Sequence, residues 1–184
     1  DIHTRNGRYP LPELPASIGS EGAGVVEAIG DGVDFVSIGD RVAYSSGGHA
    51  LPRGSYCEAR TMAADRLITL PDNIDDATAA AMTTKGLTAH YLIHDVYAVG
   101  PGDTIAVHAA AGGVGQIICQ WSRHKGARVI GIVGSDIKEP HAANAGCHHT
   151  LVRERDDIVA AVKSLTAGEG VQVVFDAVGA DTFE

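Results

Sequence analysis

The stretch that decides the fold is Val107-His108-Ala109-Ala110-Ala111-Gly112-Gly113-Val114-Gly115. An apolar run at residues 104–107 precedes it, and residues 114–124 have the composition of a helix. A continuous apolar run followed by a helical pattern predicts a buried strand, a tight turn and a helix. Within the turn, Ala110-x-Gly112-x-x-Gly115 has the spacing of the dinucleotide-binding fingerprint, with Ala in the first position.

The residue types of this turn follow from the chemistry of a bound pyrophosphate. Gly112 lets the backbone approach the phosphates, and Gly115 lets the helix pack closely on its strand. The free N–H groups at the helix start then face the anion. We therefore predict that the cofactor-binding residues in this loop are Ala111, Gly112, Gly113 and Val114.

The sequence after this turn continues to alternate between strands and helices. We expect strands at residues 128–133, 149–152 and 171–175, and helices at residues 114–124, 136–145 and 156–165. Apolar strands alternating with helices predict a parallel sheet that is covered on both faces, which is an α/β fold.

The first part of the chain has a different texture. Short β-prone runs at residues 22–30, 41–44, 55–59 and 67–70 predict a small barrel or sandwich, and residues 75–97 are helical. A turn at Gly100-Pro101-Gly102-Asp103 separates the two parts. We expect one domain at residues 1–97 and a dinucleotide-binding domain at residues 98–184.

Composition excludes several classes of protein. The 184 residues carry 14 basic and 23 acidic side chains, a net charge of −9, which argues against nucleic acid and anionic membranes as partners. No apolar run reaches the ~20 residues that a bilayer requires. The cysteines are odd in number and form no CxxC pair, which favours a reducing compartment. We interpret Cys57, Cys119 and Trp121 as packing residues.

The residues after the second expected strand bear on the choice between NAD and NADP. Gly134 and Ser135 follow that strand with no acid at its tip, and Lys138 lies one turn further. A hydroxyl and an ammonium suit a ribose 2′-phosphate, so NADPH is the expected cofactor. Asp136 lies close by and keeps NAD open as an alternative.

Taken together, the motifs resemble those of a known family. The loop at residues 109–115, Lys85-Gly86-Leu87-Thr88-Ala89 and the segments at residues 19–26, 39–42 and 173–179 are similar to those of the zinc-independent quinone oxidoreductases. These belong to the medium-chain dehydrogenase/reductase superfamily, and zeta-crystallin is a relative. The resemblance implies a GroES-like barrel domain followed by a Rossmann-type doubly wound parallel sheet.

The resemblance also implies a function and roles for individual residues. It implies a cytoplasmic enzyme, a homodimer at full length, that transfers hydride from NADPH to a quinone or related conjugated carbonyl. Tyr9 and Thr88 would lie beside the nicotinamide as catalytic residues, and Ser135 and Lys138 would hold the 2′-phosphate. Two residues depart from the family pattern: Arg153 stands where many relatives have a Tyr or His near the adenosine phosphate, and His3 stands where many have a Tyr in the substrate cleft. Arg153 could still pair with a phosphate, whereas His3 could donate to a quinone oxygen or be solvated.

The resemblance implies that zinc is absent from the active site. Zinc-dependent relatives place His and Cys at the positions of Ser20 and Lys85, and neither of these replacements is a good zinc ligand. His90 and His94, and the adjacent Cys147-His148-His149, lack a third ligand at a sensible spacing, so we expect no metal at either place.

Several alternatives stay open. An enoyl or 2-alkenal reductase, or a zinc-free alcohol dehydrogenase, would use the same cofactor site. A non-enzymatic, crystallin-like NADPH-binding role or an RNA-binding role belongs to a different class, and the net charge counts against RNA. Family members are longer than this chain, so we expect a partial barrel and the first four Rossmann strands, and no reductase activity from residues 1–184 alone.

Overall fold

The computed structural model describes residues 1–11, 14–45 and 54–183. The chain folds into two compact units, Asp1–Thr84 and Lys85–Glu184. The division falls inside a helix, before the domain boundary expected at residue 97, which stays a prediction. Each unit is described separately below.

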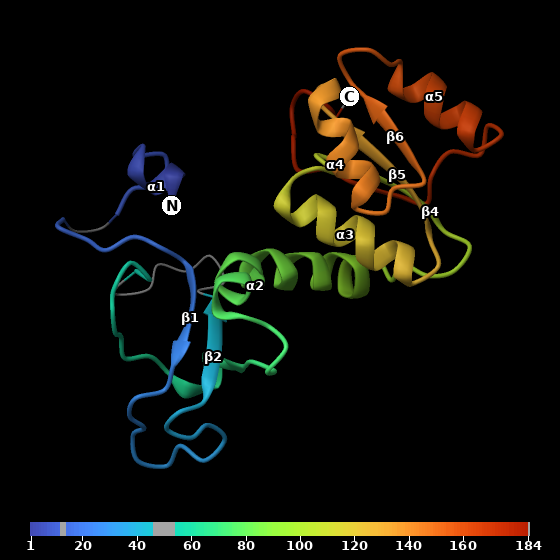
Figure 1. The fold of residues 1–184 in the computed structure, drawn as a ribbon. Helices are drawn as coiled ribbons and strands as arrows, with labels where there is room; N and C mark the ends of the chain where they lie inside the picture. The colour runs from blue at the N-terminus through green and yellow to red at the C-terminus, as the bar shows by residue number, and fades with distance from the viewer. Residues whose placement is uncertain (12–13, 46–53, 184) are drawn as a thin grey trace. The chain divides into compact units, whose positions relative to one another are not determined.

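The first unit contains a three-stranded antiparallel sheet (Figure 1). Its order is β1-β2-β3, formed by β1 (Glu21–Val25), β2 (Arg41–Ser45) and β3 (Ile68–Thr69), at three of the four places expected from the sequence. Gly22 pairs with Tyr44, and a Cβ at Gly22 would lie 2.7 Å from the Tyr44 hydroxyl. The glycine therefore leaves room for the tyrosine ring. Two short helical turns, α1 (Ile2–Arg5) and η1 (Ala64–Arg66), complete the unit.

The expected strand at residues 55–59 is wrong. The backbone N–H groups of Ser55 and Tyr56 donate to the carbonyl oxygens of Gly19 and Ile18, at 3.2 and 3.0 Å, but the segment then bends away. Cys57 is exposed, so its interpretation as a packing residue is also wrong. The run Ser-Tyr-Cys-Glu offers no alternating apolar face, which a half-buried strand needs.

The expected helical segment at residues 75–97 is confirmed as α2 (Asp76–Tyr91) followed by a π-helical turn, η2 (Leu92–Val96). Asp75 caps α2, since its Oδ1 accepts the Thr78 N–H at 2.7 Å. Arg41 of β2 reaches Asp76 in the first turn, at 2.6 Å. The carboxylate of Glu21 accepts the Thr84 N–H at 2.7 Å, which ties α2 to β1.

The second unit contains a four-stranded parallel sheet of order β6-β5-β4-β7. Its strands are β4 (Thr104–His108), β5 (Arg128–Val133), β6 (His149–Val152) and β7 (Val173–Phe175). The helical segments are α3 (Gly113–His124), η3 (Asp136–Lys138), α4 (Glu139–Asn144) and α5 (Ile158–Leu165). This alternation was expected, and the Rossmann-type sheet is confirmed. Pro140 lies in the first turn of α4, where no intrahelical N–H is needed.

Helices cover both faces of this sheet, as Figure 1 shows for α3 and α4 against α5. One buried cluster joins Val107 and Val129 to Ile118 and Cys119 of α3, with Trp121 packed against it. The other joins sheet residues to α5, and its buried members are Ala106, Ile130, Ile132 and Leu151. Cys119 and Trp121 are therefore packing residues, as expected.

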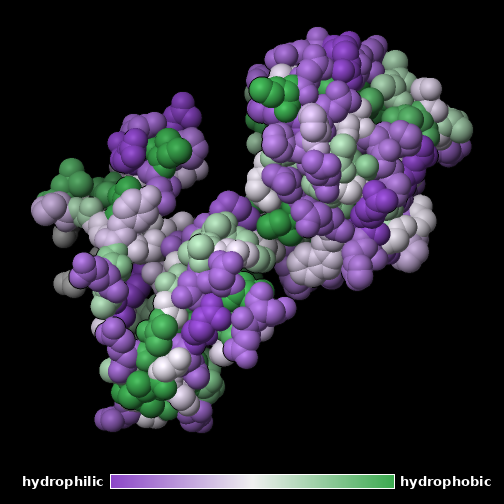
Figure 2. Space-filling view, viewed as in Figure 1, coloured by the Kyte–Doolittle hydropathy of each residue, from purple (hydrophilic) through white to green (hydrophobic). Residues whose placement is uncertain are grey.

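The first unit has a smaller core, since its buried cluster contains Val26, Val36 and Val42. Several of its large apolar side chains are exposed, among them Ile29, Phe35 and Ile38. On the face seen in Figure 2, hydrophobic residues gather at the lower end of this unit, whereas the second unit is mostly hydrophilic.

Candidate cofactor site

The turn between β4 and α3 has the tight geometry that its sequence predicts. Ala109 follows His108, the last residue of β4, and adopts a left-handed backbone with φ of 50°. The Gly112 N–H then donates to the Ala109 carbonyl at 2.8 Å, and the Ala110 N–H donates to Ile132 at 3.1 Å. The first bond closes the turn directly before α3, and the second holds the turn against β5.

Glycines in the turn permit close backbone contacts. A Cβ at Gly115 would overlap the Ala109 carbonyl oxygen and lie 2.9 Å from the Ala110 Cα. At Gly113, a Cβ would lie 2.6 Å from the Cδ atom of Lys85. Gly112 is the N-cap of α3 and has no side chain to satisfy the first N–H groups. Those groups are therefore available to an anion, which is what a pyrophosphate requires.

The topology of the sheet puts this turn at a switch point. β4 lies between β5, which continues the chain in one direction, and β7, which lies on the opposite side. In open α/β sheets, ligands bind outside the carboxyl ends of the strands at such a point. His108, Val133 and Phe175 end three of these strands, so their following loops surround one region.

A cavity of about 320 Å³ opens at this place. Five of the eight residues predicted to bind the cofactor line it: Ala111, Gly112, Gly134, Lys138 and Arg153. Gly113 and Val114 begin α3 next to this lining. Ser135 is the N-cap residue of η3, although its side chain forms no capping hydrogen bond. Their roles toward a cofactor stay predictions, but the structure brings them together.

Cationic side chains give the cavity its charge. Lys138, at the end of η3, and Arg153, directly after β6, both line it. His141 of α4 lies on the same wall. The basic groups therefore come from the carboxyl ends of β5 and β6, where the adenosine half of a dinucleotide would lie.

His108 lines the cavity, and sequence analysis did not single it out. Its Nδ1 atom is buried and makes no hydrogen bond with any residue in the described part of the chain. Burial lowers the pKa of His108, and Arg153 lowers it further, whereas Asp176 opposes these effects. The ring is therefore held in its neutral form. Its position as the last residue of the strand before the glycine turn is the sequence signal that could have found it.

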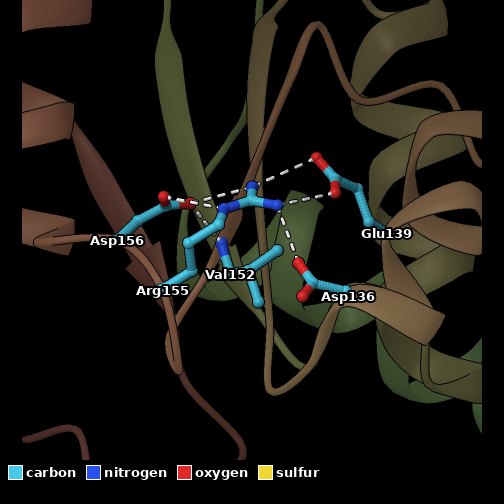
Figure 3. Close-up of polar contacts among 5 residues, drawn as sticks. All are labelled: Asp136, Glu139, Val152, Arg155 and Asp156. Carbon is cyan, nitrogen blue, oxygen red and sulfur yellow. Dashed lines mark hydrogen bonds and ion pairs between the residues drawn. The ribbon is translucent and has the colours of Figure 1, made fainter.

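Acid groups close to the cavity are held by local partners. Asp176 follows β7 and accepts hydrogen bonds from the Thr182 hydroxyl at 2.6 Å and the Val178 N–H at 2.7 Å. The Thr182 bond is the main reason that the pKa of Asp176 is low. On the other side, Asp136 of η3 lies 2.7 Å from Arg155 (Figure 3). Both carboxylates are thus engaged by local partners.

The two residues predicted to be catalytic lie in different units. Tyr9 belongs to the first unit, where its exposed ring packs edge-on against His3, with 5.4 Å between the ring centroids. Thr88 belongs to the second unit and lies on α2, half-buried. Their roles beside a nicotinamide stay predictions.

A second cavity, of about 490 Å³, lies beneath α5. Its lining is largely apolar, with Ile158, Val159 and Val162 from α5 opposite Ala106 and Val174 of the sheet. It shares His108, Ile132 and Arg153 with the first cavity.

The described residues contain neither a cluster that could hold a metal ion nor a helix that could span a membrane. In residues 1–11, 14–45 and 54–183, no group of three or more His, Cys, Asp or Glu side chains is arranged to hold a metal ion. Over the same described part, no helix combines the length and hydropathy needed to cross a bilayer.

Comparison with known proteins agrees with the fold. The family model described as alcohol dehydrogenase GroES-like domain matches residues 1–72, and that described as zinc-binding dehydrogenase matches residues 113–184. The quinone oxidoreductase of Salmonella typhimurium is 44% identical over 184 residues, covering all of this chain and 55% of the relative. Along its whole length the chain is homologous to quinone oxidoreductases, and it contains both of the matched dehydrogenase domains.

Two further relatives show how much of a full-length protein this chain matches. The crystal structure of Escherichia coli quinone oxidoreductase complexed with NADPH has a TM-score of 0.90 and 42% identity, over 99% of this chain and 55% of that one. A 2-haloacrylate reductase from a Burkholderia species is 41% identical over 189 residues, covering 100% of this chain and 56% of the relative. The chain therefore spans about half the length of the curated relatives it matches.

Proposed function

We propose that this chain carries the cofactor-binding part of an NADPH-dependent oxidoreductase that reduces a quinone or a related conjugated carbonyl. The observation that supports this most is the 320 Å³ cavity, in which the glycine turn meets Lys138 and Arg153. A glycine turn at a helix start suits a pyrophosphate, and two cations suit an added phosphate. A relative of known structure is described as complexed with NADPH, which agrees with this proposal.

The residues present fit such a cofactor. Gly112 and Gly115 leave space at the start of α3, whose N–H groups would bind the pyrophosphate. Lys138 and Arg153 would pair with the 2′-phosphate, with the Ser135 hydroxyl beside them. When bound, the nicotinamide would supply the hydride. Thr88 and Tyr9 would orient it and the substrate in the assembled active site.

We further propose that this enzyme works without zinc. Ser20 and Lys85 occupy the positions where zinc-dependent relatives are expected to have His and Cys. A serine hydroxyl and a protonated amine are poor zinc ligands. Lys85 instead lies against Gly113, at the start of α3. Polarisation of a carbonyl would then fall to hydrogen-bond donors rather than to a metal.

A second candidate is reduction of an activated carbon–carbon double bond in a compound that is not a quinone. The 41% identity to a 2-haloacrylate reductase favours it, since that relative is named for a conjugated acid. An enoyl or 2-alkenal reductase and a zinc-free alcohol dehydrogenase would have the same cofactor site. The substrate class therefore depends on residues around the nicotinamide.

The test is a pair of measurements on the full-length protein. Binding of NADPH and NADH is followed by quenching of protein fluorescence, and turnover is followed with panels of quinones, enals, 2-haloacrylates and alcohols. We expect tighter binding of NADPH and the highest turnover with quinones. Turnover of 2-haloacrylates alone would support the second candidate, and lack of binding to either nucleotide would reject the proposal.

We also propose, from the family resemblance, that the full-length protein forms a homodimer and is located in the cytoplasm. The odd number of cysteines supports a reducing compartment. Sedimentation and fractionation measurements would test them.

A further inference from the structure

The guanidinium of Arg155 lies among three carboxylates (Figure 3), two residues after the cavity-lining Arg153 in the sequence. Its Nη1 atom is 2.7 Å from Asp136 and 3.2 Å from Glu139, and its Nε atom is 3.1 Å from Asp156. Asp136 begins η3 and Glu139 begins α4, whereas Asp156 follows Arg155 in the chain. One cation therefore joins the segment after β5 to the segment after β6.

The guanidinium is anchored from the β6 side. Asp156 Oδ2 accepts the Val152 N–H at 2.8 Å, and the Asp156 N–H donates to the Val152 carbonyl at 2.8 Å. Its hydrogen bond with Arg155 is the main reason that the pKa of Asp156 is low. Arg155 is thus held at the carboxyl end of β6, and Asp136 and Glu139 approach it from the neighbouring strand.

Asp136 is the residue whose charge matters for cofactor choice. It stands two residues before Lys138, in the segment after the second strand of the dinucleotide fold. An acid in this region binds the ribose 2′-hydroxyl of NAD and repels the 2′-phosphate of NADP. In this structure, the carboxylate is ion-paired with Arg155 instead.

Arg155 offsets part of the acidic charge of its own network. Three carboxylates, Asp136, Glu139 and Asp156, stand against three cations, Lys138, Arg153 and Arg155. Without Arg155 the group has one excess negative charge. A phosphate monoester carries about −1.5 to −2 charges at neutral pH, so the excess negative charge would repel it and weaken its binding.

We propose that Arg155 is a positioning residue that sets the preference for NADPH over NADH, because it pairs with Asp136 and leaves Lys138 and Arg153 to the 2′-phosphate. The inference rests on the proposed function, since it assumes a nucleotide in the 320 Å³ cavity. Arg155 itself is absent from the lining of that cavity, and acts through Asp136.

The experiment measures dissociation constants in the full-length protein for both nucleotides. The variants are Arg155→Met, Arg155→Lys, and Arg155→Met combined with Asp136→Asn. Arg123→Met is the matched control, because Arg123 lies on α3 and donates to the Gly146 carbonyl, away from the cavity lining. The ion pairs are partly exposed, with 48% of Arg155 and 73% of Asp136 accessible, so the variants should fold.

We expect Arg155→Met to weaken NADPH binding about fivefold, in line with the loss of one surface charge interaction, and NADH binding by less than about twofold. Adding Asp136→Asn should restore most of the NADPH affinity, since the uncovered carboxylate is removed. Arg155→Lys should retain most of it, and Arg123→Met should change neither nucleotide selectively.

The outcomes separate two failures. If the unmodified protein binds neither nucleotide, the proposed function and this inference both fall. If it prefers NADPH but Arg155→Met weakens both nucleotides equally, or Asp136→Asn gives no rescue, the inference on Arg155 alone is overturned.

Discussion

The Sγ atoms of Cys119 and Cys147 lie 3.4 Å apart, although 28 residues separate them in the sequence. Cys119 belongs to α3 and Cys147 follows α4, and both thiols are buried. The contact with Cys147, together with burial, raises the pKa of Cys119, so it stays a neutral thiol. Gly131 of β5 makes room for this pair, because a Cβ there would overlap the Cys147 Sγ atom.

The first prediction follows from that close contact. We expect Gly131→Ala to lower the free energy of unfolding by about 1–3 kcal/mol, as overpacking of a core does. Combining it with Cys147→Ala should recover part of the loss, because the Sγ atom that the new methyl group would overlap is removed. Recovery should be incomplete, because Ala110 Cβ would still lie 3.0 Å from that methyl group. Urea unfolding of the two single variants and the double variant measures this. Strictly additive losses would contradict the proposed contact.

The second prediction concerns Lys138, which lines the cavity and which we propose to pair with the 2′-phosphate. We expect Lys138→Glu to weaken NADPH binding roughly ten- to hundredfold, the worth of one charge-assisted hydrogen bond at ~1.5–3 kcal/mol, and NADH far less. Lys125→Glu, at the end of α3 and outside the lining, is the control. An equal loss for both nucleotides would reject this role for Lys138.

The third prediction concerns pH and His108. Its pKa in the folded protein is lowered from 6.5, so the unfolded chain binds the proton more readily. The stability that the neutral ring contributes is therefore complete above pH 6.5 and declines as the pH falls below it. His148 has a lowered pKa too, and contributes in the same direction.

His148 is present in both the unmodified protein and the His108→Gln variant, so its contribution to the pH dependence cancels when the two are compared. Urea unfolding at pH 7.5 and 5.5 should show a smaller acid-induced loss for His108→Gln than for the unmodified protein. Asp176 and Arg153 are the charged groups that act on His108, and Asp176, whose pKa is lowered, should remain ionised over this range. The same pH dependence in both proteins would show that His108 titrates normally.

The fourth prediction concerns metal. With Ser20 and Lys85 at the two positions discussed above, we expect no stoichiometric zinc in the purified full-length protein. Treatment with EDTA should leave its reductase activity unchanged. Elemental analysis that finds one zinc per chain, lost together with activity, would overturn the proposal of zinc-free catalysis.

The fifth prediction concerns the cap of α5. Asp157 Oδ1 accepts the Ala160 N–H at 3.0 Å. Asp157→Ala should lower the free energy of unfolding by about 1 kcal/mol, because an N–H at the helix start loses its partner. Asp157→Asn keeps an acceptor and should be close to neutral. Thermal unfolding distinguishes the two, and equal destabilisation would mean that charge rather than capping is involved.

The second unit was predictable because its strands are apolar on both faces. Residues 128–133 and 149–152 become strands at the expected places, and the glycine turn identifies the site. The first unit was harder, since the segment at residues 55–59 forms two backbone bonds to Ile18 and Gly19 and then bends. Short polar runs carry too little periodicity to distinguish a strand from such a bend.

The Arg155 network could not be predicted from the sequence. Arg155 and Asp136 are 19 residues apart, and only the side-by-side pairing of β5 and β6 brings them together. Asp136 alone suggested NAD as an alternative, because a sequence shows a carboxylate without showing its partner. The same holds for His108, whose buried Nδ1 atom depends on packing against the loop after β7 and the segment after β6.

Arg153, His108 and Ile132 form a wall that the two cavities of the second unit share. A ligand in one cavity that displaced any of these side chains would change the shape of the other. For inhibitor discovery, a small acidic molecule that bound beneath α5 and paired with Arg153 would compete with a nucleotide without overlapping it. The 490 Å³ cavity is therefore a place to seek allosteric antagonists of nucleotide binding.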